Sequence, residues 1–530
     1  MDAALHGWSG IAFAYAAVQV PMMAALVRAR ATFQQYAIAP LAALPLTAVA
    51  AAGSALFAPH GIAHAVLAVG ASVLLGYAGG EVLAHDAVAD KVHRRGAHIA
   101  ERAAPRAAER DAGVSLAGLR VPAADETKHF KLIGTTGTGK STAIQELMSQ
   151  ALARGDRAVI ADPDGGYLRR FYRKERGDVI LNPFDERSVK WDLFAEIRNV
   201  YDVEQLARSL IPDHEGADRS WSGYARTFFS AVTRQARAAG IGDVGELYRL
   251  LVVADAAELR TLVRGTPAQP FLEEHNSRMF DSIRSVTSSA VGALQYIAQQ
   301  KSEHFSVRDW VDDDKPGVLF IPYKAGQIAA LRSSISGWMR LAIFETMDRG
   351  EENTSVWFVV DELDALGQID GLKDALARLR KFNGRCVLGF QSIAQVSSTY
   401  GQGDAHTIVE NCSNTLILRC SASEGGGTAR FASQLIGERE VLRTTESRSR
   451  RVTEVLGSVS RNQHFSVESA VLPSQVEQLP DLTGYLKYAS DPTWLRVRLD
   501  SKNAWNAAKT VRIAAFANEG AHRSFGADRE

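Results

Sequence analysis

Gly134-Thr135-Thr136-Gly137-Thr138-Gly139-Lys140-Ser141 follows a short apolar run, Phe130 to Ile133, and precedes a helical pattern that starts at Thr142. These residues fit the phosphate-loop pattern G-x-x-x-x-G-K-[ST], with strand, loop and helix in the required order. The glycines let backbone N–H groups close around phosphate oxygens, and the helix N-terminus adds positive potential. We therefore expect Gly134 to Thr142 to bind nucleotide, with Lys140 reaching the β- and γ-phosphates and Ser141 binding Mg²⁺.

A second apolar run, Val356 to Val360, ends in two acids, Asp361 and Glu362. Burying a strand that ends in adjacent carboxylates is costly unless the carboxylates meet a cation or water. In a chain with a phosphate loop, the pattern predicts that Asp361 holds Mg²⁺ through its water shell. Glu362 is then the base that orients the attacking water. Taken alone, the same pattern is also typical of a strand end with a helix-capping acid.

A third strand is predicted from Arg385 to Phe390, and it ends at Gln391. This amide is placed to sense the γ-phosphate or the water, although it is also an ordinary polar strand end. Before it, leucines at helical spacing predict an amphipathic helix over Gly371 to Phe382. The cations at the end of that helix either complement its dipole or supply an arginine finger to a neighbouring subunit. They are Arg378, Arg380, Lys381 and Arg385.

Short apolar runs alternate with helical patterns from His129 onward, which predicts βαβ units around a large, mostly parallel sheet and hence an α/β fold. The further strands are expected at 158–161, 179–181, 318–321, 414–420 and 494–499. Residues 199–311 are helical in pattern and predict an inserted all-α domain, which is either a structural lobe or a surface for a partner or DNA. Asp162-Pro163-Asp164-Gly165-Gly166 predicts a turn, in a place where a phosphate or a DNA-facing loop also fits.

The N-terminal part of the chain has a membrane-like composition. Before Lys91 the only basic residues are Arg28 and Arg30, and no charged residue occurs from Ala31 to Gly80. The uncharged segments 8–27, 36–57 and 62–78 are each long enough for a hydrocarbon core of about 30 Å. Basic residues follow the first and third segments, so the positive-inside rule predicts three spans with the N-terminus outside. A two-span version, with 62–78 at the interface, stays open. The charged, Ala-rich residues after Lys91 predict a helical stem.

The whole chain has ordinary averages, with 530 residues, 46% hydrophobic residues, and 60 Lys+Arg against 60 Asp+Glu. These values exclude collagen, a disordered tail and a disulfide mini-protein. Zero net charge argues against bulk charge coating of nucleic acid but allows a local basic channel. A basic surplus at Arg443, Arg448, Arg450, Arg451 and Arg461 is typical of a solvated loop or of a hairpin that grips phosphates. The three cysteines form neither a disulfide framework nor a metal-ligand spacing.

Several motifs together resemble those of the type IV secretion coupling proteins of the TraD/TrwB type, over nearly all of residues 120 to 500. Besides the phosphate loop and Asp361-Glu362, they are Ala161-Asp162-Pro163-Asp164-Gly165, Leu181-Asn182-Pro183-Phe184-Asp185, Trp191-Asp192-Leu193-Phe194, Gly389-Phe390-Gln391-Ser392, Leu435-Ile436-Gly437-Glu438 and Ala470-Val471-Leu472-Pro473. The Asn-Pro-Phe-Asp run is more diagnostic than the phosphate loop, which many families share.

The resemblance implies a RecA-like P-loop NTPase core with an inserted all-α domain and an N-terminal transmembrane helical anchor in the bacterial inner membrane. It further implies a homo-hexameric ring that binds ATP and Mg²⁺ between subunits, with its ATPase domain in the cytoplasm. Such a ring couples single-stranded DNA and its relaxase to the type IV secretion channel, the conjugation channel, by DNA-dependent ATP hydrolysis. Family members usually have two spans, so a third is a departure.

By motif position, Lys140 and Ser141 resemble the family's phosphate and Mg²⁺ contacts, and Asp361 and Glu362 resemble its acidic pair. Gln391 resembles its third-motif glutamine, and Arg380 resembles its trans-acting arginine. Two other functions stay open, namely an FtsK-like double-stranded DNA translocase and a nucleotide-gated substrate receptor without motor activity.

The predicted domains follow from these patterns. They are a transmembrane anchor at 1–85, a stem at 86–119, a RecA-like domain formed by 120–198 and 312–500, an all-α domain at 199–311, and a C-terminal tail at 501–530.

Overall fold

The computed structural model describes residues 2–29, 31, 33–57, 62–83, 91–101, 113–213, 218–350, 354–449 and 458–500. The expected C-terminal tail at 501–530 lies outside the described residues. Contacts within the chain divide it into two units. The first is Met1–Arg95 with Glu440–Glu468, and the second is Gly96–Arg439 with Ser469–Glu530.

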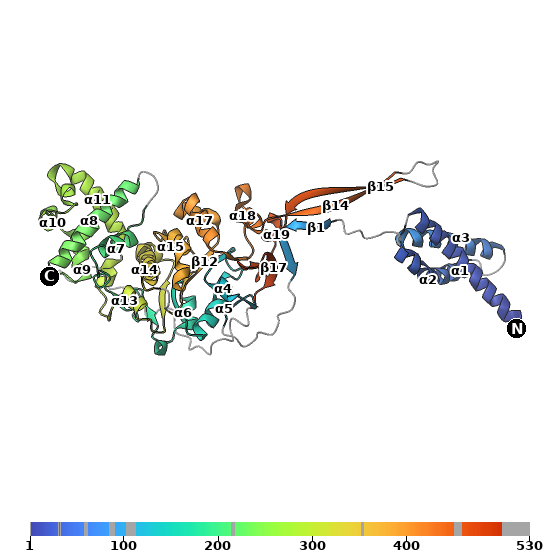
Figure 1. Cartoon of the computed structure of the whole chain (residues 1–530), viewed down its shortest axis with the longest axis horizontal. Coiled ribbons are helices and arrows are strands. Elements are labelled where there is room, and N and C mark those ends of the chain that lie inside the picture. The colour runs from blue at the N-terminus through green and yellow to red at the C-terminus, as the bar shows by residue number, and fades with distance from the viewer. Residues whose placement is uncertain are drawn as a thin grey trace. The chain divides into compact units, whose positions relative to one another are not determined.

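A ten-stranded sheet forms the centre of the second unit, counted over the residues that the structure describes (Figure 1). In spatial order its strands are β2 (His98–Glu101), β17 (Thr493–Arg498), β16 (Thr483–Lys487), β13 (Asn414–Ile417), β5 (Phe130–Ile133), β12 (Gly384–Phe390), β11 (Val356–Val360), β6 (Arg157–Pro163), β10 (Val318–Tyr323) and β7 (Val179–Ile180). Neighbouring strands pair in parallel, except that β16 is antiparallel to both β13 and β17. The prediction of a large, mostly parallel sheet is confirmed.

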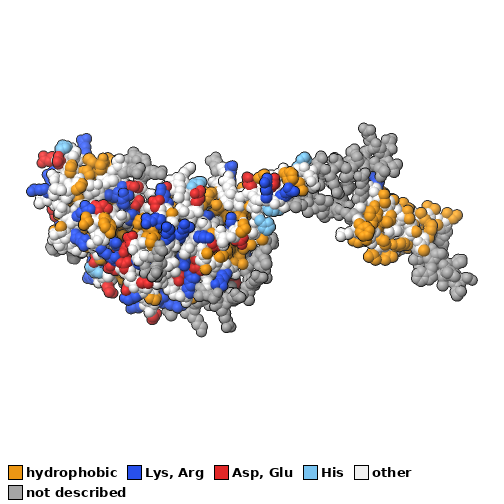
Figure 2. All heavy atoms as spheres, in the orientation of Figure 1, with side chains coloured by type: hydrophobic (Ala, Val, Ile, Leu, Met, Phe, Trp, Pro, Cys, Tyr) orange, Lys and Arg blue, Asp and Glu red, His pale blue; other side chains and the backbone are white. Residues whose placement is uncertain are grey.

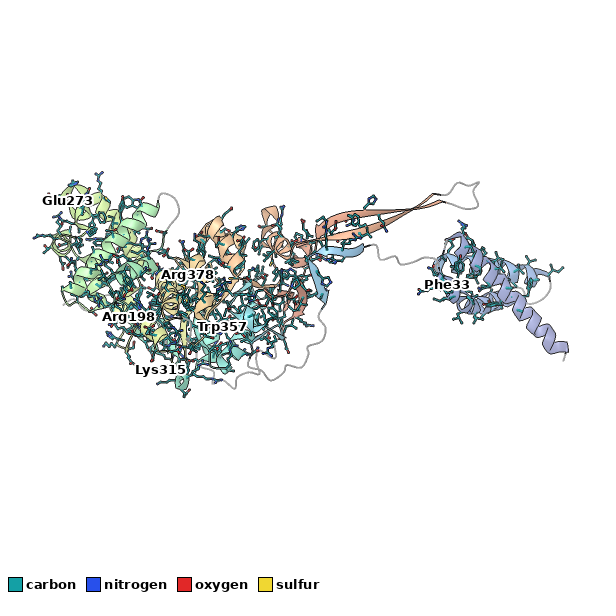
Figure 3. The ribbon with its side chains drawn as sticks, in the orientation of Figure 1. Phe33, Arg198, Glu273, Lys315, Trp357 and Arg378 are labelled. Atoms are coloured by element: carbon teal, nitrogen blue, oxygen red, sulfur yellow. The ribbon has the colours of Figure 1, made fainter. Side chains whose placement is uncertain are left out.

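Strand β11 illustrates why the sheet is buried on both faces. Val356, Phe358 and Val360 belong to one hydrophobic cluster, whereas Trp357 and Val359 belong to another. Successive strand residues point to opposite faces, so a continuous apolar run is typical of a strand that is covered on both sides. Figure 3 labels Trp357 at this position in the unit.

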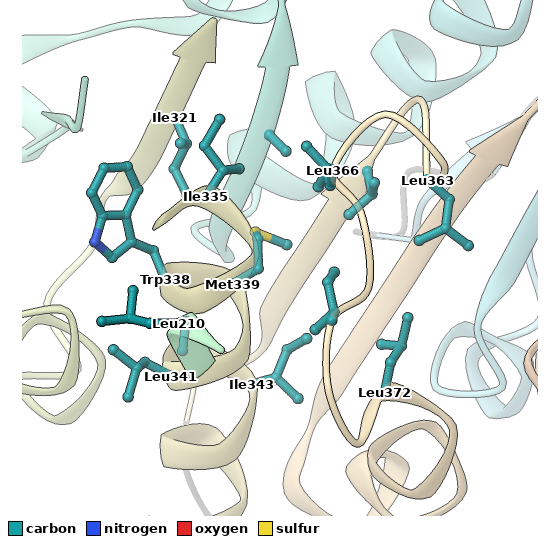
Figure 4. Close-up of a cluster of buried hydrophobic side chains, with 14 of the residues drawn as sticks. Leu210, Ile321, Ile335, Trp338, Met339, Leu341, Ile343, Leu363, Leu366 and Leu372 are labelled. Atoms are coloured by element: carbon teal, nitrogen blue, oxygen red, sulfur yellow. The ribbon is translucent and has the colours of Figure 1, made fainter. Parts of the chain in front are cut away.

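The two faces of the sheet are covered by different helices. Helix α14 (Ile328–Asp348) packs in the first cluster, and α5 (Lys140–Ala153) packs in the second. Figure 4 shows side chains of α14, among them Ile335 and Met339, beside Ile321 of β10. The same view shows Leu363 and Leu366, which follow β11 and pack in the same cluster. The residues after the acidic strand are therefore anchored in the core.

Shorter elements complete the second unit around the sheet. The helices are α4 (Ala123–Glu126), α6 (Gly166–Phe171), α15 (Leu372–Leu379), α16 (Ile393–Tyr400), α17 (Gln402–Asn411), α18 (Gly427–Ile436) and α19 (Pro473–Glu477). The single-turn helices are η1 (Lys174–Arg176), η2 (Arg249–Val253), η3 (Gln269–Leu272), η4 (Glu274–Asn276), η5 (Arg380–Phe382) and η6 (Glu424–Gly426). Two small ladders pair β3 (Ser115–Leu116) with β4 (Leu119–Arg120) and β8 (Lys190–Trp191) with β9 (His304–Phe305).

The described part of 199–311 is almost entirely helical, as expected. Its helices are α7 (Asp202–Leu210), α8 (Asp218–Ala238), α9 (Val244–Tyr248), α10 (Ala256–Leu262), α11 (Ser277–Val291), α12 (Leu294–Ala298) and the start of α13 (Val307–Asp312). The short strand β9 is the exception within this range. Buried Arg308 of α13 pairs with Asp202 at 2.9 Å and with Glu345 at 2.5 Å, which ties this lobe to α14.

Three helices begin the first unit and pack against one another, namely α1 (Asp2–Arg28), α2 (Phe33–Phe57) and α3 (Ile62–Leu83). Within the described residues, Phe33–Gly53 and Ala65–Leu83 are long and apolar enough to cross a membrane, whereas the apolar segment of α1, Ala12–Arg28, is shorter. Large apolar side chains point outward, including Phe33 at 87% exposure, and Figure 2 shows a mostly hydrophobic surface over these helices. Such a surface is typical of helices that contact lipid.

Glycines allow α3 to approach α1 closely. A Cβ atom at Gly76 would lie 2.2 Å from the carbonyl oxygen of Val18, and one at Gly80 would lie 2.6 Å from that of Met22. This Gly-x-x-x-Gly spacing is a common means of packing apolar helices against each other. Helix α1 is thus part of the same bundle as α2 and α3, whose apolar segments are longer.

The helical stem predicted after Lys91 is wrong for the residues that the structure describes. Residues 91–101 form β1 (Lys91–Gly96) and β2, because both segments pair with strands far along the chain. Strand β1 forms a three-stranded sheet with β14 (Glu438–Ser449) and β15 (Ser458–Ser469). Pairing with distant strands has overridden the helical propensity of this Ala-rich stretch.

The expected arginine-rich hairpin consists of β14 and β15. Arg443 is exposed and pairs with Glu468 at 2.8 Å. Arg450 and Arg451 lie outside the described residues, as do the side chains of Arg448 and Arg461. A phosphate-gripping role for these arginines therefore stays a prediction.

Candidate nucleotide-binding site

The phosphate loop connects β5 to α5, and two of its glycines have positive φ angles. They are Gly137, with φ 78°, and Gly139, with φ 116°. Glycine adopts such angles without strain. A Cβ atom at Gly139 would also lie 2.8 Å from a methyl group of Leu482. The backbone N–H of Leu482 donates to the carbonyl of Thr138 at 2.9 Å, so the segment before β16 holds the loop in place.

Lys140 is buried and turns back over the loop to which it belongs. Its Nζ donates to the carbonyl oxygen of Gly134 at 2.6 Å and to that of Thr135 at 3.3 Å. Burial lowers the pKa of Lys140, whereas the charges of Asp361 and Glu362 act in the opposite direction. The loop is thus closed around its own cation, which faces two carboxylates.

The acidic strand brings Asp361 to the start of α5. Ser141 Oγ donates to Asp361 Oδ2 at 2.6 Å. The backbone after β11 lies directly on β12, since a Cβ atom at Gly389 would lie 2.3 Å from the carbonyl oxygen of Asp361. The close approach of these parallel strands therefore determines where the carboxylate sits.

Glu362 and Gln391 are joined to the phosphate loop by a row of hydrogen bonds. Gln391 Nε2 donates to Glu362 Oε1 at 2.5 Å, and Thr136 Oγ1 donates to Gln391 Oε1 at 2.9 Å. Burial raises the pKa of Glu362, and the charges of Asp364 and Asp361 raise it further. A carboxylate with a raised pKa is a stronger base than an ordinary one.

These side chains line a cavity of ≈ 390 Å³ at the edge of the sheet where β5, β6, β11 and β12 end. We call this the carboxyl edge, and the other end of the same strands the amino edge. The lining residues are Thr136, Gly137, Gly139, Lys140, Ser141, Thr142, Gln145, Pro163, Asp164, Gly166, Tyr167, Asp361, Glu362, Gln391 and Leu482. Ligands of open parallel sheets bind at this edge, and the volume lies in the range of small-molecule sites.

The donor set in the cavity fits Mg²⁺. A serine hydroxyl and a carboxylate meet at one point, and Mg²⁺ prefers hard oxygen ligands, completing its shell with water and phosphate oxygens. Among the described residues, no group of three or more His, Cys, Asp or Glu side chains is placed to hold a metal ion. Ser141 and Asp361 are therefore the residues that would hold Mg²⁺ together with a nucleotide.

The sequence predicted a turn after β6, in a place where a phosphate or a DNA-facing loop also fits, but it did not identify the contacts that Asp162 and Tyr167 make. Asp162 accepts hydrogen bonds from the backbone N–H groups of Tyr167, at 3.1 Å, and Leu168, at 2.6 Å. Burial raises the pKa of Asp162 to about 7. Tyr167 donates its hydroxyl to Asp361 Oδ2 at 2.8 Å, and burial keeps the phenol protonated by raising its pKa well above the usual value. The aromatic residue directly after the Asp-Pro-Asp-Gly-Gly turn was the available signal.

Arg380 does not lie with the other expected site residues. It begins η5, at the amino edge of β12, whereas Gln391 follows the other end of that strand. The seven residues of β12 separate them by about 20 Å. Arg380 is exposed and makes no ion pair within the part of the chain that the structure describes. Figure 3 labels Arg378, which precedes it at the end of α15.

Comparisons with known proteins agree with this geometry. Residues 113–500 match the family model described as the type IV secretion-system coupling protein DNA-binding domain. The chain is 33% identical to the coupling protein TraD of Escherichia coli K12 over 384 residues, which is 71% of this chain and 53% of TraD. It is 30% identical to the coupling protein VirD4 of Bartonella quintana over 129 residues, which is 24% of this chain and 19% of VirD4. The chain thus spans about half the length of TraD.

Solved structures extend the similarity to the fold. The plasmid coupling protein TrwB in complex with the ATP analogue ADPNP matches with a TM-score of 0.70 and 30% identity, over 81% of this chain and 98% of TrwB. TrwB in complex with ADP and Mg²⁺ matches with a TM-score of 0.69 and 30% identity, over 80% and 97%. The core is therefore a RecA-like P-loop NTPase fold with an inserted helical lobe, as expected.

Proposed function

The chain belongs to the type IV secretion-system coupling proteins, and on that premise we propose that it is a membrane-anchored ATPase that drives DNA transfer into a secretion channel. One arrangement carries the proposal of hydrolysis. Ser141 is hydrogen-bonded to Asp361, and Thr136 is hydrogen-bonded through Gln391 to Glu362. Both groups line a single cavity together with Lys140.

ATP and Mg²⁺ are the proposed cofactors, which the complexes of TrwB with an ATP analogue and with ADP and Mg²⁺ support. Bound Mg²⁺ supplies neutralisation of the phosphate charge. Lys140 contacts the β- and γ-phosphates, and backbone N–H groups of Gly134 to Thr142 surround them. Glu362 takes a proton from the attacking water. Gln391 senses whether a γ-phosphate is bound, through its hydrogen bond with Thr136 of the phosphate loop. Each role rests on the position of that residue at the carboxyl edge.

Arg380 is proposed to act on the nucleotide of a neighbouring subunit in a homo-hexamer. Its distance from its own site, together with its exposure, supports a role between subunits rather than within one. An arginine supplied in this way stabilises the charge that develops during phosphoryl transfer. Hydrolysis would then require a neighbouring subunit in the ring.

The N-terminal helices are proposed to anchor the protein in the bacterial inner membrane, with the ATPase core in the cytoplasm. The apolar windows of α2 and α3 support an anchor. The close packing of α1 on Gly76 and Gly80 of α3 supports a third span. With three spans, the basic residues that follow the first and third segments favour an N-terminus outside. This arrangement departs from the two spans that are usual in the family.

The proposed substrates are single-stranded DNA and the relaxase bound to it, delivered to the channel proteins of the secretion system. The similarity to TraD and the match to a DNA-binding-domain model support this assignment. The arginines of the β14–β15 hairpin are the proposed contacts to DNA phosphates.

The test is ATP hydrolysis by the full chain in lipid nanodiscs, with and without single-stranded or double-stranded DNA. We expect single-stranded DNA to stimulate turnover, and Glu362→Gln to abolish the stimulated rate while retaining ATP binding. ATP binding without turnover under any condition would favour a nucleotide-gated receptor. Stimulation by double-stranded DNA alone would favour an FtsK-like translocase.

A further inference from the structure

The turn Asp162-Pro163-Asp164-Gly165-Gly166 reverses the chain and fixes the start of α6. Asp164 and Gly165 have φ angles of 58° and 66°, and the N–H of Asp164 donates to the carbonyl of Tyr323 at 2.8 Å. The fully buried Asp162 carboxylate accepts two N–H groups from the first turn of α6, those of Tyr167 and Leu168. The turn therefore fixes the backbone of Tyr167 at the carboxyl edge.

The side chain of Tyr167 reaches from this fixed backbone to the acidic strand. Tyr167 is 2% exposed, and its hydroxyl lies 2.8 Å from Asp361 Oδ2. Ser141 Oγ lies 2.6 Å from the same oxygen. Two donors on one oxygen restrict rotation of the carboxylate, and Tyr167 reaches it from an element 194 residues away.

We propose that Tyr167 is a positioning residue for the metal site: its hydroxyl holds the Asp361 carboxylate in the orientation that binds the nucleotide-bound divalent cation. The inference rests on one part of the proposed function, namely that a metal–nucleotide complex binds in the cavity. Tyr167 acts through Asp361 and needs no contact with the nucleotide. Hydrogen-bond partners of this kind typically change metal affinity or activity by about 10- to 100-fold when removed.

Tyr167→Phe tests the proposal, because it removes one hydroxyl and keeps the buried ring. Tyr172→Phe is the matched control at the end of the same helix, where the ring packs against Phe320. The full chain is saturated with ADP and titrated with Mg²⁺ by calorimetry, and ADP binding is measured separately in EDTA. In Tyr167→Phe we expect the Kd for Mg²⁺ to rise by about 10-fold or more, with ADP binding in EDTA unchanged. A Kd for Mg²⁺ that stays within about twofold of wild type would overturn the proposal.

Turnover provides a second readout that separates positioning from a purely structural role. In Tyr167→Phe, excess Mg²⁺ is expected to restore kcat, so that the half-saturating Mg²⁺ concentration rises while the limiting rate is retained. A lower kcat that excess Mg²⁺ does not restore, with Mg²⁺ affinity unchanged, contradicts the proposal.

The calorimetric experiment also keeps the two proposals apart. If the wild-type chain binds ADP with Mg²⁺ but does not hydrolyse ATP, the proposed function fails, and the Mg²⁺ affinities still decide the role of Tyr167. If the wild-type chain hydrolyses ATP and Tyr167→Phe binds Mg²⁺ normally, only the inference about Tyr167 fails. A wild-type chain that does not bind ADP with Mg²⁺ contradicts both.

Discussion

The two edges of the central sheet both carry acids, but in different environments. At the carboxyl edge, Asp361 and Glu362 face a cavity, and burial raises the pKa of Glu362. At the amino edge, Arg154 lies 2.6 Å from both Glu126 and Asp156, and the indole N–H of Trp357 also donates to Asp156. Burial opposes ionisation of Glu126, but the hydrogen bond and charge of Arg154 bring its pKa below the usual value.

The contrast separates structural acids from functional ones. An acid that is neutralised by cations of its own chain stabilises the fold, whereas adjacent acids that line a cavity are suited to an added cation or to catalysis. The acids of the amino edge are therefore structural. Arg380 at this edge is exposed and makes no ion pair among the described residues.

Arg380→Ala is expected to have the largest effect on the rate of hydrolysis. Such an effect would break the contrast between the edges, because Arg380 lies at the edge whose acids are structural. If Arg380 acts on the nucleotide of a neighbour, kcat falls by about 10³-fold or more, since a trans-acting arginine stabilises the transition state. ATP affinity and thermal stability are expected to stay at wild-type values. Lys381→Ala, in the same helical turn, is the control and retains its rate. An unchanged kcat in Arg380→Ala would remove this residue from catalysis.

Glu362→Gln changes the carboxyl edge without changing its shape. We expect kcat to fall by about 10²- to 10⁴-fold, because the amide does not accept the proton of the attacking water. ATP affinity, measured by equilibrium binding, is retained. In the wild type, the acidic limb of the pH–rate profile is expected above 4.5, the ordinary pKa of a glutamate, because burial raises the pKa of Glu362. Undiminished hydrolysis would exclude Glu362 as the base.

Glu126→Ala tests the amino edge, where the account predicts a loss of stability rather than of activity. The change removes the carboxylate that pairs with buried Arg385, and it leaves half-buried Arg154 with Asp156 alone. Removing one partner of a buried ion pair is expected to cost about 4 kcal/mol of unfolding free energy. Denaturant unfolding of the full chain in detergent measures it, and Glu477→Ala, at an exposed site, is the control. A stable variant with lost ATP binding would reverse the assignment of the two edges.

His129, at the amino edge, is expected to make the stability of the fold depend on pH. This is the smallest of the predicted effects. Its Nδ1 accepts the N–H of Cys386 at 3.0 Å, its Nε2 lies 2.9 Å from the carbonyl oxygen of Leu376, and burial lowers its pKa to about 4. The folded state thus binds fewer protons than the unfolded state between pH 4 and 6.5. Stability is therefore expected to fall by up to about 3 kcal/mol as the pH is lowered through that window. In His129→Gln this slope flattens, and an unchanged slope would exclude His129 as its source.

The sequence was most informative where a motif and a buried strand coincide. The runs at Phe130, Val356 and Arg385 predicted β5, β11 and β12 closely, because strands covered on both faces are continuously apolar. Strand β16 was not predicted, since Gly484 interrupts its apolar pattern, and β2 lies in an Ala-rich stretch. Strand β16 pairs with β13, and β2 pairs with β17, so each depends on a strand that is distant in the sequence.

The parts of the candidate site that come from sequence motifs were predicted, and the other contacts were not. The phosphate loop and the acids lie together because parallel strands end at one edge. The contacts of Asp162 and Tyr167 were not predictable, since they depend on how the turn after β6 folds onto β11. The position of Arg380 follows from its place before β12, at the amino edge and away from the other expected site residues.

Mixing two inactive variants tests the proposed cooperation of the edges most directly. Glu362→Gln subunits lack the base but keep Arg380, and Arg380→Ala subunits lack the arginine but keep Glu362. In mixed rings, some interfaces combine the intact Glu362 of one subunit with the intact Arg380 of the next. The account predicts that an equimolar mixture recovers DNA-stimulated phosphate release well above that of either variant alone. A mixture as inactive as its components would contradict it.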